Sequence, residues 1–412
     1  MIPHHHKRTD CRLCASQMLE CVLHLTPTPP ANALVPATEK NKTQVAYPLD
    51  VYRCADCGHL QLLDIIDPKV LFSHYVYVSS TSSVMVGYLR DQCAAIISRL
   101  KLKPGDLVVE FGSNDGTLLR FFKEAGMRVL GVDPAANVAP DASEIETVGD
   151  FFSAEVARQI REQYGPAKAI CAYNVCAHID NLRDVVDGVS LLLAPDGQFI
   201  FEVGYLLDVY QKTLFDTIYH EHVDFHHVEP LKLFFSERGL KLLHAERSNI
   251  QGGALVGYVG SLTGQENQTV TKLIKMEHEA GLQSAGTFRR WENAIKQRGE
   301  ELMALLGSLK AKGKSIVAYG AAAKATTLMY HFGLDGSLLD YIVDDNPLKH
   351  GMLTPGLHVP ICSPDVLYQQ KPDYVLVLAW NFAERIIEKH KHYAGNDSRF
   401  IIPLPNLAIV GE

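Results

Sequence analysis

Short apolar runs that alternate with amphipathic segments mark out the middle of this chain. Four runs, LVVEFG, RVLGVD, AICAYNVCAH and GQFIFEVG, each have the length of a buried strand and are separated by segments long enough for a helix. Thr117–Ala125 is expected to form one of these helices, and residues 82–100 carry apolar side chains at helical spacing. This order of elements predicts a doubly wound α/β sheet.

A second alternating pattern fills the last third of the chain. Residues 255–310 are predicted to be mostly helical, and SIVAYGAAAK then begins a new unit of strand, glycine turn and helix. YIVDDN, VPI and DYVLVLAWN supply further strands. Because GVDPAAN and IVDDNPL stand at equivalent positions after the second strand of each unit, we hypothesise an internal duplication. Different strand orders in the two units would contradict it.

The N-terminal segment follows neither pattern. PTPPANALVP is rich in proline and is predicted to be a loop. Cys11, Cys14, Cys54 and Cys57 form two CxxC motifs about forty residues apart. Two such turns supply four thiolates, the ligand set of a structural zinc ion without an open coordination position. His59 is a weak competitor for one ligand position, and unpaired or redox cysteines are the alternative to zinc.

These patterns predict an α/β protein of three domains. We expect an N-terminal zinc-binding domain over residues 1–80, a Rossmann-like α/β domain over 81–260 and a second Rossmann-like α/β domain over 261–412. A chain of 412 residues is too long for a single compact core, which agrees with this division.

Composition narrows the class of protein. The chain is 47% hydrophobic and 21% charged, with a net charge of −8, and it lacks the basic run that would favour nucleic-acid binding. No apolar run approaches the roughly 18 residues of a membrane span, and the N-terminus has no hydrophobic signal region. The nine cysteines do not form a disulfide framework. We therefore expect a cytoplasmic protein that binds neither nucleic acid nor membranes.

The turn EFGSNDG after the first strand has the character of a cofactor site. Ligands bind at this edge of open α/β sheets, and Gly112 and Gly116 allow the backbone to approach them closely. The acidic Glu110 would repel a pyrophosphate but suits the amino group of S-adenosylmethionine. Asp133, at the end of the next strand, is placed for a ribose, and Asp150–Phe152 for an adenine. NAD is the rival ligand, and a cleft that binds no ligand is also possible.

A second run, YHEH, brings a phenol, a carboxylate and two imidazoles together. Tyr219 and Glu221 share a face in extended backbone, whereas Tyr219 and His222 do so in a helix. A carboxylate next to His222 would raise the pKa of the imidazole and orient it as a general base, while a phenol would donate to a developing oxyanion. His178 follows the third strand at the cofactor edge; taken alone, it is more often a structural residue.

Two further groups of polar residues flank these runs. His226 and His227 are expected in a solvated turn. The segment SHYVYVSS adds phenols and hydroxyls between the N-terminal domain and the first α/β domain, a favoured place for a substrate. An aromatic loop that packs between the domains is the alternative.

Together these runs resemble the S-adenosylmethionine-dependent sugar C-methyltransferases of deoxysugar biosynthesis. Members of that family act on nucleotide-linked 4-keto sugars such as those leading to tetronitrose, mycarose and noviose. The resemblance covers almost the whole chain and rests on the paired CxxC motifs and on YVYVSS, EFGSNDG, NVCAHI, YHEH, the Gly252-Gly253 pair, GAAAK and AWN. The combination is specific, although no single motif would be.

The resemblance implies a function and assigns residues to it. It implies methylation of C3' of a dTDP- or GDP-linked 4-keto-6-deoxy sugar through an enolate, with the C-terminal domain holding the nucleotide-sugar. The implied catalytic residues are Tyr75, His178, Tyr219, Glu221 and His222. The residues expected to bind the cofactor are Glu110, Gly112, Asn114, Asp115, Gly116, Asp133, Pro134, Asp150, Phe151, Phe152 and Asn174. The residues expected to bind the substrate are Tyr77, Ser79, Ser80, Lys324 and Asn381.

Several questions stay open at this point. Tyr75 and Tyr77 compete for the role of the first phenol, Glu221 competes with His222 as the base, and C5 competes with C3 as the methylated carbon. An O- or N-methyltransferase would need no proton abstraction from carbon. An NAD-dependent sugar dehydratase or epimerase and a non-catalytic sugar-nucleotide-binding module are rival functions from different classes. We expect a monomer.

Overall fold

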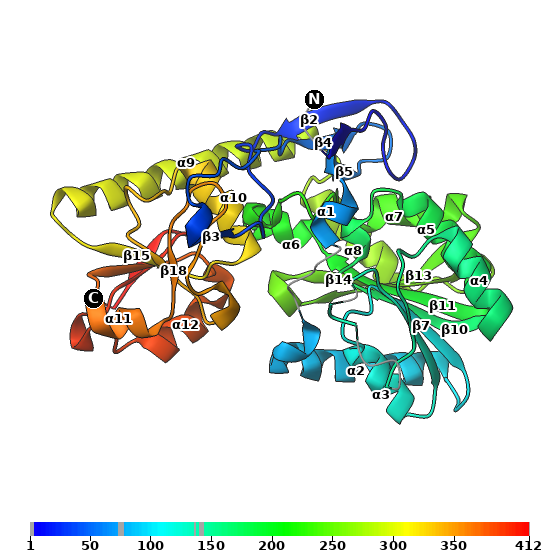
Figure 1. Ribbon diagram of the computed structural model, residues 1–412. Helices are drawn as coiled ribbons and strands as arrows, with labels where there is room; N and C mark the ends of the chain where they lie inside the picture. The colour runs from blue at the N-terminus through cyan, green and yellow to red at the C-terminus, as the bar shows by residue number, and fades with distance from the viewer. Residues whose placement is uncertain (1–3, 73–77, 136, 140–143, 412) are drawn as a thin grey trace.

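Two α/β units stand side by side, and an N-terminal segment lies along the top of both (Figure 1). This computed structural model describes residues 4–72, 78–135, 137–139 and 144–411. The expected fold class, an N-terminal zinc-binding segment followed by two Rossmann-like α/β units, is confirmed.

The first unit is built on a seven-stranded sheet in the order β13-β14-β11-β10-β7-β8-β9. Its strands are β7 (Leu107–Phe111), β8 (Arg128–Val132), β9 (Thr147–Val148), β10 (Ala167–Tyr173), β11 (Leu193–Gly204), β13 (Leu240–Ser248) and β14 (Ala254–Ser261). Strands β7 to β11 run parallel, whereas β14 pairs antiparallel with both β11 and β13. The helix predicted from residue 255 is therefore wrong over β14, because a short, fully buried apolar run looks the same in a strand and in a helix.

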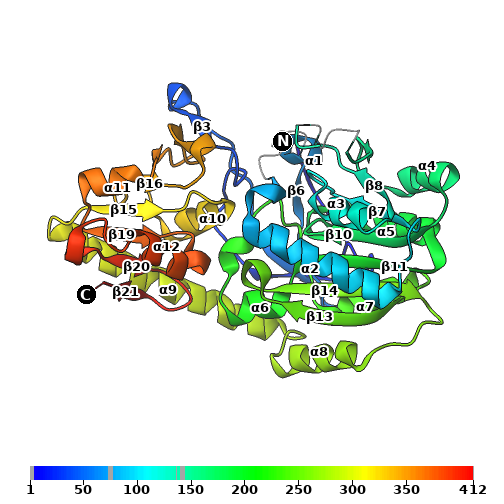
Figure 2. The same ribbon diagram turned by 90° about the horizontal axis from the view of Figure 1, so that it is seen from below.

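Helices cover both faces of this sheet. The helices α2 (Ser83–Leu100) and α3 (Thr117–Glu124) lie below it, and α5 (Leu182–Leu192) and α7 (Val228–Glu237) lie above it. Figure 2, seen from below, shows α2 crossing the lower face. The hydroxyl of Ser82 caps α2 by accepting the N–H of Met85, and Lys101 ends the helix in a left-handed conformation. Both predicted helices, 82–100 and Thr117–Ala125, are confirmed to within one residue. The unit also contains α4 (Ala154–Tyr164), α6 (Leu206–Gln211) and α8 (Gln268–Glu279).

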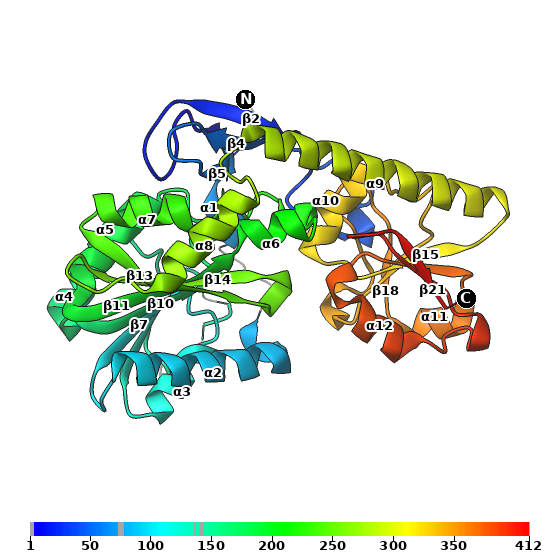
Figure 3. The ribbon, with the colours of Figure 1, turned by 180° about the vertical axis from the view of Figure 1, so that it is seen from behind.

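The second unit repeats this plan on a six-stranded sheet in the order β18-β16-β15-β19-β20-β21. Its strands are β15 (Ile316–Tyr319), β16 (Ile342–Val343), β18 (Ile361–Cys362), β19 (Tyr374–Val377), β20 (Phe400–Ile402) and β21 (Ala408–Val410). The helices α9 (Ala285–Ala311) and α10 (Ala323–Phe332) lie on one face, and α11 (Asp365–Gln370) and α12 (Ala383–His390) lie on the other (Figure 3).

The two sheets share one strand order. Taken along the chain, β7, β8, β9, β10, β11 and β14 occupy the same successive places as β15, β16, β18, β19, β20 and β21. In both sheets the last of these strands is antiparallel to its neighbour. The difference in strand order that would have contradicted an internal duplication is not found, so the hypothesis stands.

The N-terminal segment joins both units through shared sheets. A four-stranded sheet combines β2 (Leu19–Leu23), β4 (Val51–Cys54) and β5 (Leu60–Leu62) with β12 (Asp224–Phe225) of the first unit. A two-stranded sheet pairs β3 (Val35–Pro36) with β17 (Met352–Leu353) of the second unit. A further pair joins β1 (His5–Lys7) to β6 (Asp64–Ile66), which α1 (Pro68–Phe72) follows. No helix among the described residues is long and apolar enough to cross a membrane.

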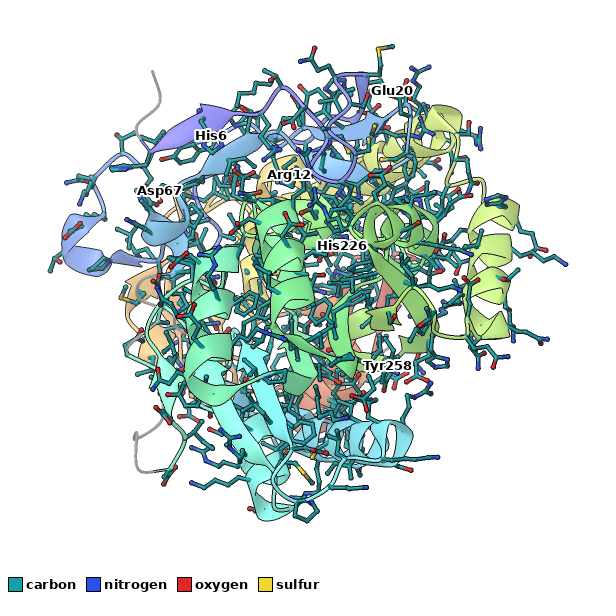
Figure 4. The ribbon with its side chains drawn as sticks, turned by 90° about the vertical axis from the view of Figure 1, so that its right-hand side faces the viewer. His6, Arg12, Glu20, Asp67, His226 and Tyr258 are labelled. Carbon is teal, nitrogen blue, oxygen red and sulfur yellow. The ribbon has the colours of Figure 1, made fainter. Side chains whose placement is uncertain are left out.

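The solvated turn predicted for His226 and His227 is wrong. Both residues are 1% exposed, and the His226 ring stacks on His59 of the N-terminal segment with 5.5 Å between the ring centroids. Figure 4 shows His226 and Arg12 in the interior, where the N-terminal segment meets the first unit. The Arg12 guanidinium donates to the Val223 carbonyl at 3.2 Å, and this contact helps to fix the two parts together.

Candidate active site

Four cysteines converge at the end of the N-terminal sheet. Cys11 and Cys14 precede β2, Cys54 ends β4 and Cys57 follows in the next turn. Their sulfur atoms all lie within 4.8 Å of one another, and the pairs Cys11–Cys57 and Cys14–Cys54 are 3.6 Å apart. Zn–S bonds of about 2.3 Å in a tetrahedron place two sulfurs about 3.8 Å apart, so these thiols fit zinc.

His59 does not compete for this metal. Its Nε2 atom lies 2.6 Å from Oδ1 of Asp224, and both side chains are fully buried. This imidazole therefore contacts the carboxylate of β12 instead of completing the thiolate cluster. The ligand set is the one expected from the two CxxC motifs.

The turn after β7 forms a tight cradle. Gly112 has φ +67°, and a Cβ atom there would lie 2.2 Å from Val175. The carboxylate of Asp133, at the end of β8, accepts the N–H groups of Asn114 and Ala135, each at 2.8 Å. These bonds fix the backbone that a cofactor would approach, and they leave the ribose role of Asp133 a prediction.

Glu110 gives this cradle a buried carboxyl group that the surrounding side chains do not satisfy. The residue is 5% exposed, and its Oε2 atom has no hydrogen-bond partner. Burial raises the pKa of Glu110 well above its ordinary value, and the carboxylates of Asp133 and Asp115 raise it further. A buried orphan carboxylate beside two other acids favours a cationic ligand, which fits the ammonium and sulfonium groups of S-adenosylmethionine.

Ser79 and Ser80 lie against the same loop. Their N–H groups donate to Asn114 Oδ1 and Asp115 Oδ2, respectively, each at 3.0 Å. They thus support the cofactor loop directly, and contact with a substrate stays a prediction. Tyr75 and Tyr77 lie outside the described residues.

The other residues expected to bind the cofactor differ in their burial and in their contacts. Asn174 follows β10 with φ +57° and donates from Nδ2 to Glu202 at 2.8 Å. Phe152 stacks on Phe111 with 4.6 Å between ring centroids, inside the main hydrophobic core. Phe151 is 37% exposed instead. The remaining members of this set, Gly116, Pro134 and Asp150, lie in the turns that follow β7, β8 and β9.

Tyr219 and His222 meet in a turn, which is the helical one of the two pairings that the sequence left open. The His222 N–H donates to the Tyr219 carbonyl at 2.8 Å. Nδ1 of His222 lies 2.7 Å from the Thr217 carbonyl, which only accepts, so Nδ1 carries the proton. Nε2 therefore presents its lone pair and accepts from the Tyr219 hydroxyl at 3.1 Å. This tautomer suits a general base.

The expected rise in the pKa of His222 is wrong. Burial lowers this pKa to about 3, and His178, whose ring centroid lies 4.9 Å away, lowers it further. Burial also lowers the pKa of His178 to about 4. Glu221 does not pair with His222, because its Oε1 accepts from the Asn32 amide at 2.7 Å. Burial raises the pKa of Glu221 to about 7.

All three parts of the molecule contribute to this cluster. Asn32 comes from the N-terminal segment, whereas Lys324 comes from the first turn of α10 in the second unit. The Nζ atom of Lys324 is buried without a hydrogen-bond partner. The hydroxyl of Thr327, one turn later, donates to the Ile218 carbonyl at 2.8 Å and holds α10 against the YHEH run. Asn381 is half-buried in the turn after β19.

Sequence reasoning missed two contacts of this site. Asn32 stands in a segment predicted only as a loop, and no periodic pattern marks it. Asp216 accepts a hydrogen bond from Trp380, a residue of the AWN motif to which the sequence assigned no role. A search for isolated polar residues beside recognised motifs would have found Asp216, three residues before Tyr219.

Comparisons with known proteins agree with this arrangement. Family models match in three places: a zinc binding domain over residues 11–72, a methyltransferase domain over 85–245 and a C-methyltransferase C-terminal domain over 249–405. The C-methyltransferase NovU of Streptomyces niveus is 34% identical over 405 residues, which are 97% of this chain and 96% of NovU.

Solved structures resemble parts of the chain more distantly. The PH0226 protein of Pyrococcus horikoshii is 16% identical, with a TM-score of 0.36 over 45% of this chain and 94% of its own. The magnesium protoporphyrin IX methyltransferase of Synechocystis with bound S-adenosylmethionine is 13% identical, with a TM-score of 0.32 over 43% of this chain and 82% of its own.

Proposed function

We propose that this chain methylates C3 of the sugar in a nucleotide-linked 4-keto-6-deoxy sugar through an enolate. The chain belongs to the S-adenosylmethionine-dependent sugar C-methyltransferase family. One observation carries the proposal: the unprotonated Nε2 of His222 lies in a buried cluster with His178, whose backbone N–H donates to the Val175 carbonyl beside the Gly112 turn. Such a constellation suits the removal of a proton from carbon next to an electrophilic methyl group.

The chemistry needs an acidic C–H bond. The 4-keto group acidifies the neighbouring C3 proton, which passes to Nε2 of His222. The electron pair of the broken C–H bond moves onto C3 and the C4 oxygen as an enolate. The Tyr219 hydroxyl must first release Nε2 of His222 so that this nitrogen can take the proton. Tyr75, Tyr219 or His178 then donates a hydrogen bond to the enolate oxygen, and one such donor contributes on the order of 3 kcal/mol to catalysis. Bound S-adenosylmethionine supplies the methyl group that C3 takes up.

The low pKa of His222 is compatible with this role. A pKa of about 3 keeps the imidazole neutral at neutral pH, with a lone pair on Nε2 but a low proton affinity. An enolate next to the ring would raise that pKa as it forms, because opposite charges attract. Glu221, with a pKa of about 7, is the competing base.

We propose that the three expected domains divide the work. Residues 1–80 bind the structural zinc ion and supply Asn32, residues 81–260 hold the cofactor, and residues 261–412 hold the nucleotide-sugar. The buried Lys324 supports the last assignment, because an unpaired ammonium suits an anionic substrate. The described cysteines are all free, which supports a reducing, cytoplasmic setting. The monomeric state stays a prediction.

Mass spectrometry of candidate substrates in heavy water tests the function. dTDP- and GDP-linked 4-keto-6-deoxy sugars would each be incubated with the enzyme and S-adenosylmethionine. A product one methyl group heavier, with deuterium exchanged into the remaining substrate, is expected and identifies the nucleotide. NMR then distinguishes C3 from C5. A methyl group found on oxygen or nitrogen would contradict C-methylation.

Two variants separate the candidate bases. His222→Asn is expected to abolish both deuterium exchange at C3 and methyl transfer, while Glu221→Gln keeps measurable exchange. If exchange survives in His222→Asn and disappears in Glu221→Gln, the base is Glu221. Binding of S-adenosylmethionine to both variants, measured by calorimetry, serves as the control for folding.

A further inference from the structure

Asp216 and Trp380 form a buried contact between the two α/β units. Trp380 Nε1 donates to Asp216 Oδ2 at 2.7 Å, and Asp216 is fully buried. Asp216 lies in a short 3-10 turn, Phe215–Thr217, directly before the Thr217 carbonyl that fixes the tautomer of His222. The reaction described above gives these two side chains no task.

Lys324 faces this contact from α10. Lys324 and Thr327 are three residues apart and so share one face of the helix, and Thr327 binds the Ile218 carbonyl two residues after Asp216. The Lys324 Nζ and the Asp216 Oδ1 are both buried without a hydrogen-bond partner. A buried charge is costly unless polar or oppositely charged groups stabilise it, and these two groups carry opposite charges when both are ionised.

The charges of the two groups depend on each other. Burial lowers the pKa of Lys324, and attraction to Asp216 raises it. Burial likewise raises the pKa of Asp216 to about 6, while Lys324 lowers it. Lys324 also lowers the pKa of His222, so the ammonium lies within electrostatic reach of the proposed base. The carboxylate thus favours a protonated lysine at the reacting end of the site.

We propose that Asp216 and Trp380 are positioning residues that hold Lys324 as a charged ammonium, aimed at an anionic oxygen of the sugar substrate. Trp380 fixes one oxygen of Asp216, and the other stays available to Lys324. The short turn Phe215–Thr217 thereby aligns the lysine and the base together. This inference rests on the proposed function and adds to it the group that maintains the charge of the lysine.

A titration of Lys324 tests the inference without any substrate. NMR of protein with ¹⁵N-labelled lysine gives the pKa of Nζ, with the signal assigned through Lys324→Met. Asp216→Asn is expected to lower this pKa by about 1–3 units, because an opposite charge at close range is lost. Asp216→Glu restores most of the wild-type value. An unchanged pKa in Asp216→Asn would overturn the proposal.

Kinetics provide the second readout. In Asp216→Asn the alkaline limb of the kcat/KM profile should move to lower pH by the same amount, and Asp216→Glu should restore it. Thr327→Val, which removes a neutral bond at the same contact, is the matched control and should leave the limb in place. A lower kcat in Asp216→Asn without a shift of the alkaline limb of the kcat/KM profile would show that Asp216 has only a structural role. If the wild-type enzyme methylates no keto sugar, the proposed function fails while the NMR titration still decides this inference.

A separate observation concerns the opposite end of the N-terminal sheet. Cys21 lies in β2, His24 just after it and Asp50 just before β4. Cys21 Sγ is 3.5 Å from His24 Nδ1, and that nitrogen is 3.3 Å from Asp50 Oδ1. All three donor atoms lie within 4.8 Å of one another. Tetrahedral zinc would separate a sulfur and a nitrogen ligand by about 3.6 Å and a nitrogen and an oxygen ligand by about 3.4 Å.

We infer that Cys21, His24 and Asp50 form a second zinc site, distinct from the four-cysteine cluster. A thiolate, an imidazole and a carboxylate are a ligand combination that favours zinc, and three protein ligands leave one position open. The backbone N–H of His24 donates to Glu292 of α9 at 2.7 Å, so the site lies where the N-terminal sheet meets the long helix. A bound ion there would join β2 to β4.

Zinc stoichiometry tests this site. Elemental analysis of protein equilibrated with micromolar zinc is expected to give two ions per chain, and one in the double variant Cys21→Ser, His24→Ala. Cobalt substitution should show a sulfur-to-cobalt absorption band that this variant weakens. The control Cys93→Ser, at a buried cysteine away from both clusters, should retain two ions. One ion in the wild-type chain under these conditions would overturn the inference.

Discussion

The two α/β units share one backbone turn but surround it with different ionisable side chains. After β7, the Gly112 N–H binds the Val132 carbonyl at 2.8 Å; after β15, the Gly320 N–H binds the Val343 carbonyl at 2.7 Å. The carboxylates at the ends of β8 and β16 then accept backbone N–H groups in the same way, Asp133 from Asn114 and Asp344 from Ala321, each at 2.8 Å.

The side chains around these matching backbones differ. The first turn carries Glu110, which is buried with an unpaired oxygen, whereas Ala318 occupies the equivalent place in β15. The second turn leads into the helix that bears Lys324, and its Ala321 carbonyl accepts a bond at 2.9 Å from Lys349, which follows β16 and pairs with Asp344 at 3.2 Å. We therefore propose that the same backbone turn binds a cationic group in the first unit and an anionic group in the second.

Removal of the structural zinc ion should have the largest effect and should disturb both turns equally. Cys54→Ser breaks a site whose zinc binding contributes on the order of 10 kcal/mol in small domains. Because the N-terminal segment shares sheets with both units, we expect aggregation or a strongly lowered melting temperature, and weaker binding of both ligands. Calorimetry checks this, with Cys93→Ser as the control. Loss of only one ligand would show that the segment supports one unit alone.

His222→Asn should lower the rate of the chemical step without weakening the binding of either ligand. A positioned general base contributes about 10²–10⁴-fold to the rate, and kcat should fall by that factor. Dissociation constants for the cofactor and for the nucleotide-sugar, measured by calorimetry, should change less than about threefold. A weakened cofactor affinity would place His222 in the cofactor site instead.

Glu221→Gln should change how the free energy of unfolding depends on pH, because the buried Glu221 carboxylate destabilises the folded protein. The folded-state pKa of about 7 lies above the unfolded value, so the ionised carboxylate destabilises the fold as pH rises from about 4.5 to 7. Glutamine keeps the acceptor for Asn32 without the charge. We expect the variant to be more stable by about 2 kcal/mol at pH 8 and equal to wild type at pH 4, in urea unfolding. Equal stability at both values would contradict the raised pKa.

The paired variants Asp133→Asn and Asp344→Asn should give the smallest and most discriminating effects. Each loses charge-assisted bonds to backbone N–H groups, which contribute on the order of 1–2 kcal/mol. Asp133→Asn should weaken cofactor binding by about tenfold and leave the nucleotide-sugar unaffected, and Asp344→Asn should do the reverse. Each variant is the control for the other. If both variants weaken the binding of both ligands equally, the two turns do not bind separate ligands.

Much of this fold was predictable because parallel strands are buried on both faces. The runs of β7, β8, β10 and β15 are almost continuously apolar, and such runs stand out between helices. The same property misled the prediction at β14, where a buried run also fits a helix. The cysteine spacing predicted the metal cluster because two short turns are enough to define it.

The site was only partly predictable. Tyr219 and His222 are close in sequence, so their contact followed from spacing. Asn32 and Glu221 are 189 residues apart, and Asp216 and Trp380 are 164 apart, so their contacts depend on how the three parts pack. The predicted direction of the pKa shift of His222 was wrong for a related reason: burial lowers this pKa, and the neighbouring Glu221 binds Asn32 instead of the imidazole. The catalytic and binding roles themselves stay predictions.

The long helix α9 has a mechanical consequence. Its 27 residues span about 40 Å, and Figure 3 shows it running from the N-terminal sheet across the second unit. Glu292 holds it to His24 near one end, and Gly299 packs closely against Phe332 of α10 further along. A hydrogen-bonded helix resists stretching, so α9 acts as a strut of fixed length. We therefore expect the distance between the N-terminal sheet and α10 along this axis to change only if one of these two contacts breaks.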